Sequence, residues 1–237
     1  MRLRTSSLAL LAIAVALLSV PALASAASNG GVTPGGEGGV APGAGDGSAV
    51  QLSAKPSATV GKPFRISGRV ADGSGGSVTI QGRRPRGAWQ PVATTRAGSS
   101  GGFATSWTPK EPGELELRAV AGRGNGQTSA TGSTSSSPRK VTVYRMARAT
   151  WYGPRFYGNR MACGGRLTTR TLGVAHRTLP CGTRVAFRYN GRSITVPVVD
   201  RGPYSNGADW DLTSATARRL GFTHTARIAA APLSSSR

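Results

Sequence analysis

Residues 193–204, with the sequence SITVPVVDRGPY, decide the fold of the C-terminal part of this chain. The run before the aspartate is mostly β-branched or apolar and too short for a stable helix, so it predicts a buried β-strand. Asp200 ends this strand, and the Arg-Gly-Pro that follows it predicts a turn. An aspartate in this place either orders the turn through its side chain or acts as a general acid.

Other short apolar runs surround this strand, and one helix is evident among them. Ser214–Leu220 form the helix, Thr213 or Asp211 can cap its first turn, and Gly221 stops it. One helix among many short strands predicts a closed β-barrel, which we place at residues 146–232.

The composition indicates two domains and a strongly basic protein. With 34 Gly among 237 residues and a hydrophobic content of 38%, a single core of this length would be poor. The 30 Lys and Arg against 9 Asp and Glu give a net charge of +21, which excludes an ordinary acidic cytosolic enzyme. The 2 Cys and 2 His are too few for a four-cysteine zinc site or a histidine-rich metal centre. We therefore expect no metal and no cofactor.

The N-terminus has the pattern of a secretory signal peptide at residues 1–26. Arg2 and Arg4 precede an apolar run at residues 8–18, and the small residues 24–26 supply a cleavage site. The apolar run is shorter than the roughly 20 residues of a membrane span. We therefore expect cleavage after residue 26, no transmembrane segment, and a protein that is secreted or held in the cell envelope.

Two further segments separate the signal peptide from the barrel. Residues 27–48 are rich in Gly and Pro and predict a disordered linker. Residues 49–145 alternate apolar and polar residues between turn signals, which predicts a small β-sandwich. This region resembles the immunoglobulin-like domains often appended to exported bacterial proteins. It contains neither Cys nor His, so we interpret it as a spacer or adhesion module. Residues 233–237 form a C-terminal tail.

Four segments of the barrel region strongly resemble the RlpA-like (rare lipoprotein A) family. They are ATWYG at 149–153, AHRTLPCGT at 175–183, VDRGPY at 199–204 and DLT at 211–213. The resemblance implies an all-β fold, a six-stranded double-psi β-barrel of the kind shared with expansins and barwin-like proteins. It also implies a lytic transglycosylase that cuts peptidoglycan glycan strands, preferring strands without peptides. Other members of the family show no activity and bind wall polysaccharide only.

The acidic residues of the barrel region are few enough to name the candidate catalytic groups. Asp200, Asp209 and Asp211 are its only acids, so a catalytic carboxyl must be one of them. The family's catalytic aspartate falls in the segment that contains Asp200. Asp211 is the second candidate, because expansin-like relatives place their essential aspartate in the corresponding segment; the alternative for Asp211 is a helix cap. Asp209 is interpreted as a solvated loop residue.

One histidine and several aromatic residues complete the predicted site. The resemblance makes His176 the second catalytic residue, orienting Asp200 or the substrate or assisting proton transfer; the alternative is a histidine that holds its own loop. Tyr152, Tyr204 and Trp210 are candidates for stacking on sugar rings, because flat rings with polar edges suit pyranose faces. Arg201, next to Asp200, is a further candidate for substrate binding.

Cys163 and Cys181 stand where the family usually has no cysteine. They lie eighteen residues apart in a chain expected to be exported, so a disulfide is the default expectation. Closing such a loop contributes roughly 3 kcal/mol in the chain-entropy model. A cysteine nucleophile is disfavoured in an oxidising compartment.

Two functions remain open at this point. The first is a cell-wall lytic transglycosylase with Asp200 as acid and base; the second is a non-catalytic, expansin-like module that binds peptidoglycan or another wall polysaccharide. The positive charge also favours contact with anionic wall polymers. A nucleic-acid binder rests on charge alone and has no recognisable binding motif, so we expect no nucleic acid. We expect a monomer.

Overall fold

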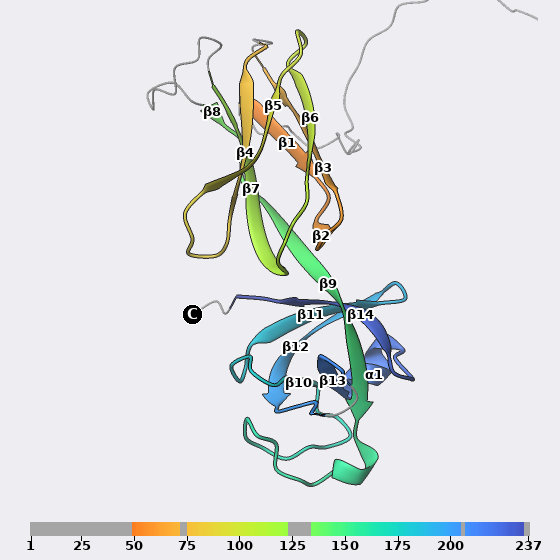
Figure 1. Cartoon of the computed structure of the whole chain (residues 1–237). Coiled ribbons are helices and arrows are strands. Elements are labelled where there is room, and N and C mark those ends of the chain that lie inside the picture. The colour runs from red at the N-terminus through yellow and green to blue at the C-terminus, as the bar shows by residue number, and fades with distance from the viewer. Residues whose placement is uncertain (1–48, 72–74, 123–133, 205–206, 235–237) are drawn as a thin grey trace, which may run out of the picture. The chain divides into compact units, whose positions relative to one another are not determined.

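The computed structural model describes residues 49–71, 75–122, 134–204 and 207–234 (Figure 1). The predicted signal peptide and the Gly/Pro-rich linker lie outside these residues. Strands make up almost all of the regular structure that is described, so the all-β prediction is confirmed. No helix within the described ranges has the length and apolar character of a membrane span.

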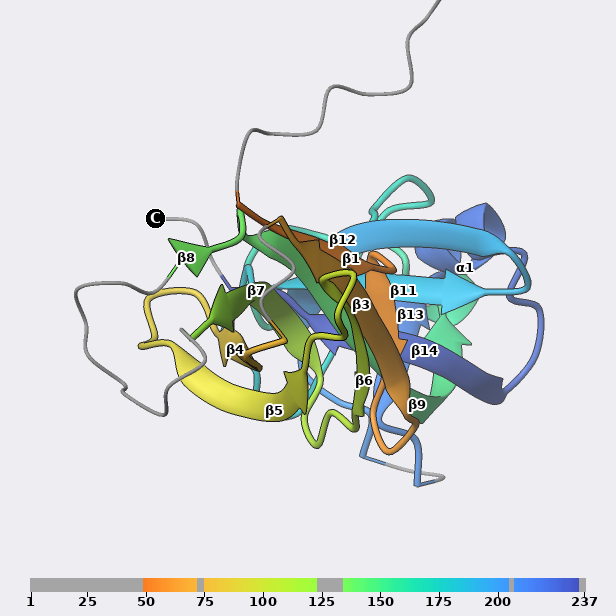
Figure 2. The same ribbon diagram turned by 90° about the horizontal axis from the view of Figure 1, so that it is seen from above.

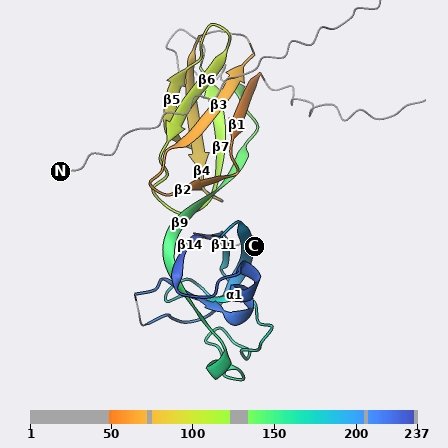
Figure 3. The ribbon, with the colours of Figure 1, turned by 90° about the vertical axis from the view of Figure 1, so that its right-hand side faces the viewer.

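The first eight strands come from the region predicted to be a sandwich. They are β1 (Val50–Ala54), β2 (Ser57–Thr59), β3 (Phe64–Val70), β4 (Ser77–Arg83), β5 (Gln90–Arg96), β6 (Gly102–Trp107), β7 (Gly113–Ala121) and β8 (Thr134–Ser135). Strands β1, β3 and β6 lie side by side in one sheet (Figures 2 and 3). Strands β5, β4 and β7 continue into β9 (Arg139–Tyr152) in a second sheet.

The two sheets enclose one hydrophobic core because their strands alternate inward and outward residues. Phe64 and Ile66 of β3 pack with Val78 and Ile80 of β4 and with Leu117 of β7. The relation of this region to immunoglobulin-like domains stays a prediction.

The later elements form the barrel. They are β9, the 3₁₀ turn η1 (Pro154–Phe156), β10 (Val174–Ala175), β11 (Arg184–Tyr189), β12 (Arg192–Asp200), β13 (Trp210–Thr213), α1 (Ser214–Leu220) and β14 (Ala226–Pro232). Going round the ring, the strand order is β9, β14, β11, β12, β10, β13 and back to β9. The pairs β10–β12 and β9–β13 are parallel, and the other pairs are antiparallel. The predicted closed barrel of six strands with one helix is therefore confirmed.

Strand β9 runs through the predicted domain boundary without a break. Its first part pairs with β7 as far as Val143, and its second part pairs with β14 from Arg145 onward. The change of partner falls beside the boundary expected between residues 145 and 146, and the chain stays in one strand there.

The helix begins and ends as the sequence indicated, and the structure decides between the two possible caps. The Thr213 hydroxyl accepts a hydrogen bond from the Thr216 N–H, and Gly221 ends the helix in the left-handed conformation with φ 66°. Asp211 does not cap the helix. Its side chain is therefore available for another role.

Candidate active site

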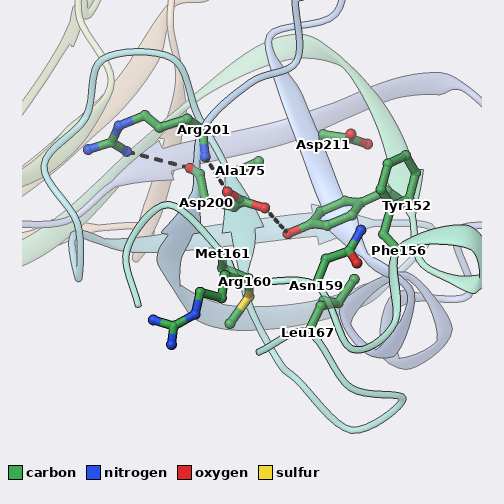
Figure 4. Close-up of a pocket in the computed structure, with 10 residues that line it drawn as sticks. All are labelled: Tyr152, Phe156, Asn159, Arg160, Met161, Leu167, Ala175, Asp200, Arg201 and Asp211. Carbon is green, nitrogen blue, oxygen red and sulfur yellow. Dashed lines mark hydrogen bonds between the residues drawn. The ribbon is translucent and has the colours of Figure 1, made fainter. Parts of the chain in front are cut away.

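A pocket of about 230 Å³ lies where β10, β12 and β13 meet the loop that follows β9. We call this loop, residues 153–173, the wall loop. The residues lining the pocket are Tyr152, Phe156, Asn159, Arg160, Met161, Leu167, Ala175, Asp200, Arg201 and Asp211 (Figure 4). Two of the three candidate acids thus share one cavity.

Strand register explains why Asp200 and Asp211 come together. Ala175 of β10 lies opposite Asp200 of β12 on one side and opposite Asp211 of β13 on the other. Residues directly opposite each other in a sheet have neighbouring side chains. The small side chain of Ala175 leaves room between the two acids.

A shift in register turns Asp200 toward the pocket. Val174 lies opposite Val198, yet the next residue, Ala175, lies opposite Asp200, so Val199 is skipped. Without this irregularity Asp200 would share the face of Val198, whose side chain is in the barrel core. Bulges of this kind often re-aim a side chain next to an active site.

The Asp200 carboxylate accepts three hydrogen bonds. Oδ1 accepts from the backbone N–H of Ala162 at 2.8 Å and of Arg201 at 2.9 Å. Oδ2 accepts from the Tyr152 hydroxyl at 3.4 Å (Figure 4). Donors on both oxygens fix the orientation of this carboxyl group in the pocket.

Asp211 lies in a different environment. Burial raises the pKa of Asp211, the nearby Asp200 charge raises it further, and the hydrogen bond from Thr150 opposes the rise. That bond runs from Thr150 Oγ1 to Asp211 Oδ1 at 2.7 Å. The two acids therefore differ in their surroundings: Asp200 accepts hydrogen bonds on both oxygens, and burial makes Asp211 retain its proton more readily than an ordinary aspartate.

Tyr152 lines the same pocket as the two acids and feels the charge of both. Burial raises the pKa of Tyr152, and the charges of Asp200 and Asp211 add to the effect. The phenol therefore stays protonated and acts as a donor to Asp200. The ring also makes an edge contact with Phe156, with the ring centroids 6.1 Å apart.

His176 follows Ala175, which lines the pocket, and the described contacts of its side chain are with residues outside the pocket lining. Its Nδ1 accepts hydrogen bonds from the backbone N–H groups of Thr178 at 3.2 Å and Leu179 at 3.0 Å. Its ring packs on Trp210, with centroids 4.5 Å apart. Among the described contacts, His176 reaches Asp200 through the backbone, its N–H donating to the Asp200 carbonyl at 3.2 Å. These contacts support a histidine that holds its own loop, and the expectation that its side chain orients Asp200 finds no contact to support it.

The pH dependence of folding should report the environment of His176. Burial and the charge of Arg177 lower the pKa of His176. A histidine whose pKa falls on folding contributes stability above its unfolded pKa of about 6.5, and that stability is lost as the pH falls below this value. Urea unfolding at pH 7.5 and pH 5 should therefore show a smaller acid-induced loss in His176→Asn than in the wild-type protein. The difference should be small because the half-buried ring is screened by water; equal losses would contradict the interpretation.

The prediction that Trp210 stacks on sugar is wrong. Trp210 is only 5% exposed and packs in the barrel core, where its ring meets Phe187 edge to face at 5.3 Å. Neighbouring residues of a strand face opposite sides, so a tryptophan next to Asp211 turns away from the pocket that Asp211 faces.

The other predicted binding residues remain available to a ligand. Tyr204 is 79% exposed. Arg201 lines the pocket, and its guanidinium donates to the His176 carbonyl at 3.4 Å and to Cys181 Sγ at 3.3 Å. Asp209 lies on the surface, where it accepts from the Arg148 N–H at 3.1 Å.

Sequence reasoning missed the contribution of the wall loop. It supplies Phe156, Asn159, Arg160 and Met161 to the pocket. A second hollow of about 380 Å³ shares Tyr152, Phe156 and Asp211 with the first, so the two hollows lie next to each other and we refer to them together as the groove. The length of the wall loop was the signal that could have indicated this role, because long irregular loops in compact domains are commonly functional.

The predicted disulfide is present. Cys163 and Cys181 are bonded, with their Cα atoms 5.5 Å apart. Within the described residues, no group of three or more His, Cys, Asp or Glu side chains is arranged to hold a metal ion.

Comparison with known proteins places the barrel in a recognised class. Residues 145–231 match the family described as lytic transglycolase, DPBB_1. This range contains the pocket and all of its lining residues. The remaining residues lie outside the match.

Individual relatives agree with this assignment of the barrel region. A probable endolytic peptidoglycan transglycosylase RlpA of Synechocystis sp. is 48% identical over 76 residues, which cover 31% of this chain and 24% of that protein. The similarly named protein of Aquifex aeolicus is 42% identical over 86 residues, covering 35% of this chain and 38% of its own. The endolytic peptidoglycan transglycosylase RlpA of Neisseria meningitidis is 40% identical over 78 residues, covering 32% and 33%.

The extent of these matches limits the comparison to the barrel. The chain spans between 24% and 38% of the length of these three relatives. Among solved structures, the Streptomyces papain inhibitor is 26% identical and covers 38% of this chain and 94% of its own, at a TM-score of 0.31. That score is too low to carry an argument.

Proposed function

We propose that this protein is an exported lytic transglycosylase that cleaves the glycan strands of peptidoglycan without water. The observation that carries the proposal is the pair of unlike carboxyl groups in one pocket. Burial raises the pKa of Asp211, whereas Asp200 is held in place by three hydrogen bonds to its two oxygens. The class of relatives that match the barrel supports the choice of substrate.

The proposed reaction needs one proton donor and one proton acceptor. Asp211 donates a proton to the glycosidic oxygen as its bond to the anomeric carbon breaks. The C6 hydroxyl of the same sugar forms the new bond to that carbon, and its proton passes to Asp200. The products are a strand with an anhydro end and a strand with a new free hydroxyl. The carboxyl groups then return to their starting states by exchanging a proton.

This division of roles amends the simpler expectation that Asp200 alone acts as acid and then as base. In the simpler scheme, one carboxyl group donates the first proton and takes the second. The two schemes agree that Asp200 is essential and differ over Asp211.

The rest of the chain is proposed to place the barrel at its substrate. The expected signal peptide would export the protein, and the linker and the two-sheet region, proposed to be immunoglobulin-like, would act as tether and spacer. The full chain has a net charge of +21, of which Arg2 and Arg4 of the expected signal peptide supply only two, so the exported part stays strongly basic; this supports additional contact with anionic wall polymers.

The test is product analysis on defined glycan. The purified protein is incubated with peptide-free glycan strands, and the products are weighed by mass spectrometry. Anhydro-ended sugars support lytic cleavage. Reducing ends would show a hydrolase instead, and intact strands would overturn the enzymatic proposal.

A non-catalytic wall-binding module is the second candidate. The observation that favours it is the exposure of aromatic rings near the groove: Trp151 is 40% exposed and Phe156 51% exposed. Such rings bind sugar without any chemistry. Intact strands that sediment with the protein would support this candidate.

Replacing Tyr152 by Phe tests the link between the tyrosine and Asp200. Tyr152→Phe should lower the rate of anhydro-sugar release about tenfold, because the pocket loses a donor to the charged carboxylate. The fold should be unaffected, because the bond that is lost is long, at 3.4 Å. Since its raised pKa keeps Tyr152 protonated, the loss should be the same at pH 6 and pH 9. A deficit confined to one end of this pH range would contradict the assigned role.

A further inference from the structure

The tip of the wall loop, residues 158–167, contacts Asp200 directly. The Ala162 N–H donates to Asp200 Oδ1 at 2.8 Å, and the Cys163 N–H donates to the Val199 carbonyl at 3.2 Å. Cys163 is also bonded to Cys181. Two hydrogen bonds therefore join the tip to the end of β12, and one disulfide joins it to the turn before β11.

The tip is held together by its own hydrogen bonds. The Gly158 N–H donates to the Leu167 carbonyl at 2.8 Å, and the Leu167 N–H donates to the Asn159 carbonyl at 3.0 Å. A displacement at Cys163 would therefore move the tip as a unit. The tip forms one side of the pocket through Asn159, Arg160, Met161 and Leu167.

The other end of the disulfide is fixed to the strand that carries Asp200. In the turn after Cys181, the Gly182 N–H donates to the Val198 carbonyl at 2.8 Å, and the Val198 N–H donates to the Thr183 carbonyl at 2.9 Å. The Arg201 guanidinium also contacts Cys181 Sγ at 3.3 Å. The disulfide thus links the pocket wall to a fixed point beside the acid.

We propose that the Cys163–Cys181 disulfide is a positioning element for the cleavage reaction, and that it acts by holding the Ala162 N–H on Asp200. The inference rests on the proposed function. Without the covalent link, the described contacts that hold the tip to β12 are two hydrogen bonds, from the Ala162 N–H to the Asp200 side chain and from the Cys163 N–H to the Val199 carbonyl. The tip then leaves Asp200 part of the time, the carboxylate loses one of its two donors on Oδ1, and the pocket wall opens. Small displacements of this kind are costly in catalysis because the reacting groups must stay aligned.

The kinetic test compares two destabilised proteins. The double variant Cys163→Ser/Cys181→Ser should lose at least about tenfold in kcat for anhydro-sugar release, with a smaller change in KM. Val185→Ala is the matched control, because Val185 is fully buried in the barrel core on β11 and does not line the pocket. At a temperature where circular dichroism shows both variants folded, the control should stay within about twofold of the wild type. Equal kcat in the double variant and the wild type would overturn the proposal, as would equal losses in the double variant and the control.

Reversible reduction gives a rescue experiment on the unaltered sequence. Dithiothreitol transfers two electrons and two protons to the disulfide, giving two thiols, and is itself oxidised to a cyclic disulfide. The activity of the reduced protein should fall as in the double variant and return after reoxidation. A loss that persists in the refolded, reoxidised protein would contradict a positioning role.

Hydrogen exchange tests, without any assay of activity, whether the disulfide holds the tip on Asp200. On reduction, the amides of Ala162 and Cys163 should exchange at least about tenfold faster, while those of β11 stay protected. Unchanged exchange at Ala162 would overturn the proposal even if the enzyme is active. If the wild-type protein releases no anhydro-sugars, the proposed function fails, and the exchange data still decide whether the disulfide holds the tip.

Discussion

The Asp200→Asn variant is expected to release anhydro-ended sugars at no more than about a thousandth of the wild-type rate. An amide cannot accept the proton of the attacking hydroxyl, and general acid–base groups contribute roughly 10² to 10⁴ in rate. The structure should survive the change, because an amide oxygen can accept from the Ala162 and Arg201 N–H groups as the carboxylate Oδ1 does. Mass spectrometry of products from peptide-free strands measures the rate.

The same variant separates the two candidate functions. Its affinity for glycan strands, measured by co-sedimentation, should stay within about threefold of the wild type, because shape and hydrogen bonding are retained. Asp209→Asn is the control: Asp209 is also an acid of the barrel, and it lies outside the pocket. The control should keep its activity. If Asp200→Asn cleaves at more than a tenth of the wild-type rate, Asp200 is not the base.

The elements of the barrel could be predicted from local patterns. The short apolar runs indicated the strands, and the Gly221 stop and threonine cap indicated the helix, because these signals depend only on neighbouring residues. The scarcity of acids in the barrel region limited the choice of catalytic group to three aspartates. The order of the strands around the ring required the structure, since pairing between distant segments leaves no local signal; the resemblance implied only a six-stranded double-psi β-barrel.

The direction of individual side chains could not be predicted in the same way. Simple alternation along β12 places Asp200 on the face of Val198, in the core; the register shift at Val199 reverses it. Along β13, in contrast, simple alternation correctly places Trp210 and Asp211 on opposite faces of the strand. Asp211 was chosen through the resemblance and Trp210 as an aromatic ring beside the acids, although adjacent residues of a strand face opposite ways.

The position of the wall loop could not be predicted from the sequence for a different reason. The loop has no apolar period to indicate a strand or helix, so its position depends on contacts with other segments. The disulfide between Cys163 of this loop and Cys181 was predicted from the oxidising compartment expected of an exported protein. That the tip of the loop would reach Asp200 through the Ala162 N–H required the structure.

Asp211→Asn is expected to combine loss of activity with a gain in stability. The pKa of Asp211 is raised chiefly by burial. A carboxyl group whose pKa rises on folding contributes its full stability below the unfolded value of about 3.9 and loses it as the pH rises through the folded value. At neutral pH this carboxyl group therefore lowers the free energy of unfolding. An amide can still accept from Thr150 and carries no charge, so the Tm of the barrel at pH 7 should rise by roughly 4–8 °C, the shift that about 1 kcal/mol gives in a domain of 60–100 residues.

The activity of Asp211→Asn decides which proton-transfer scheme operates. If Asp211 donates the first proton, the variant should lose about 10² to 10⁴ in kcat with little change in strand binding. If Asp200 serves as both acid and base, Asp211→Asn keeps most of its activity and only Asp200→Asn is inactive. The Tm gain should shrink as the pH is lowered toward 4, because the wild-type carboxyl becomes protonated there and the two proteins then carry the same charge at this position. An Asp211→Asn variant that is inactive and also less stable than the wild type at pH 7 would contradict this interpretation. The loss of activity would then result from damage to the fold.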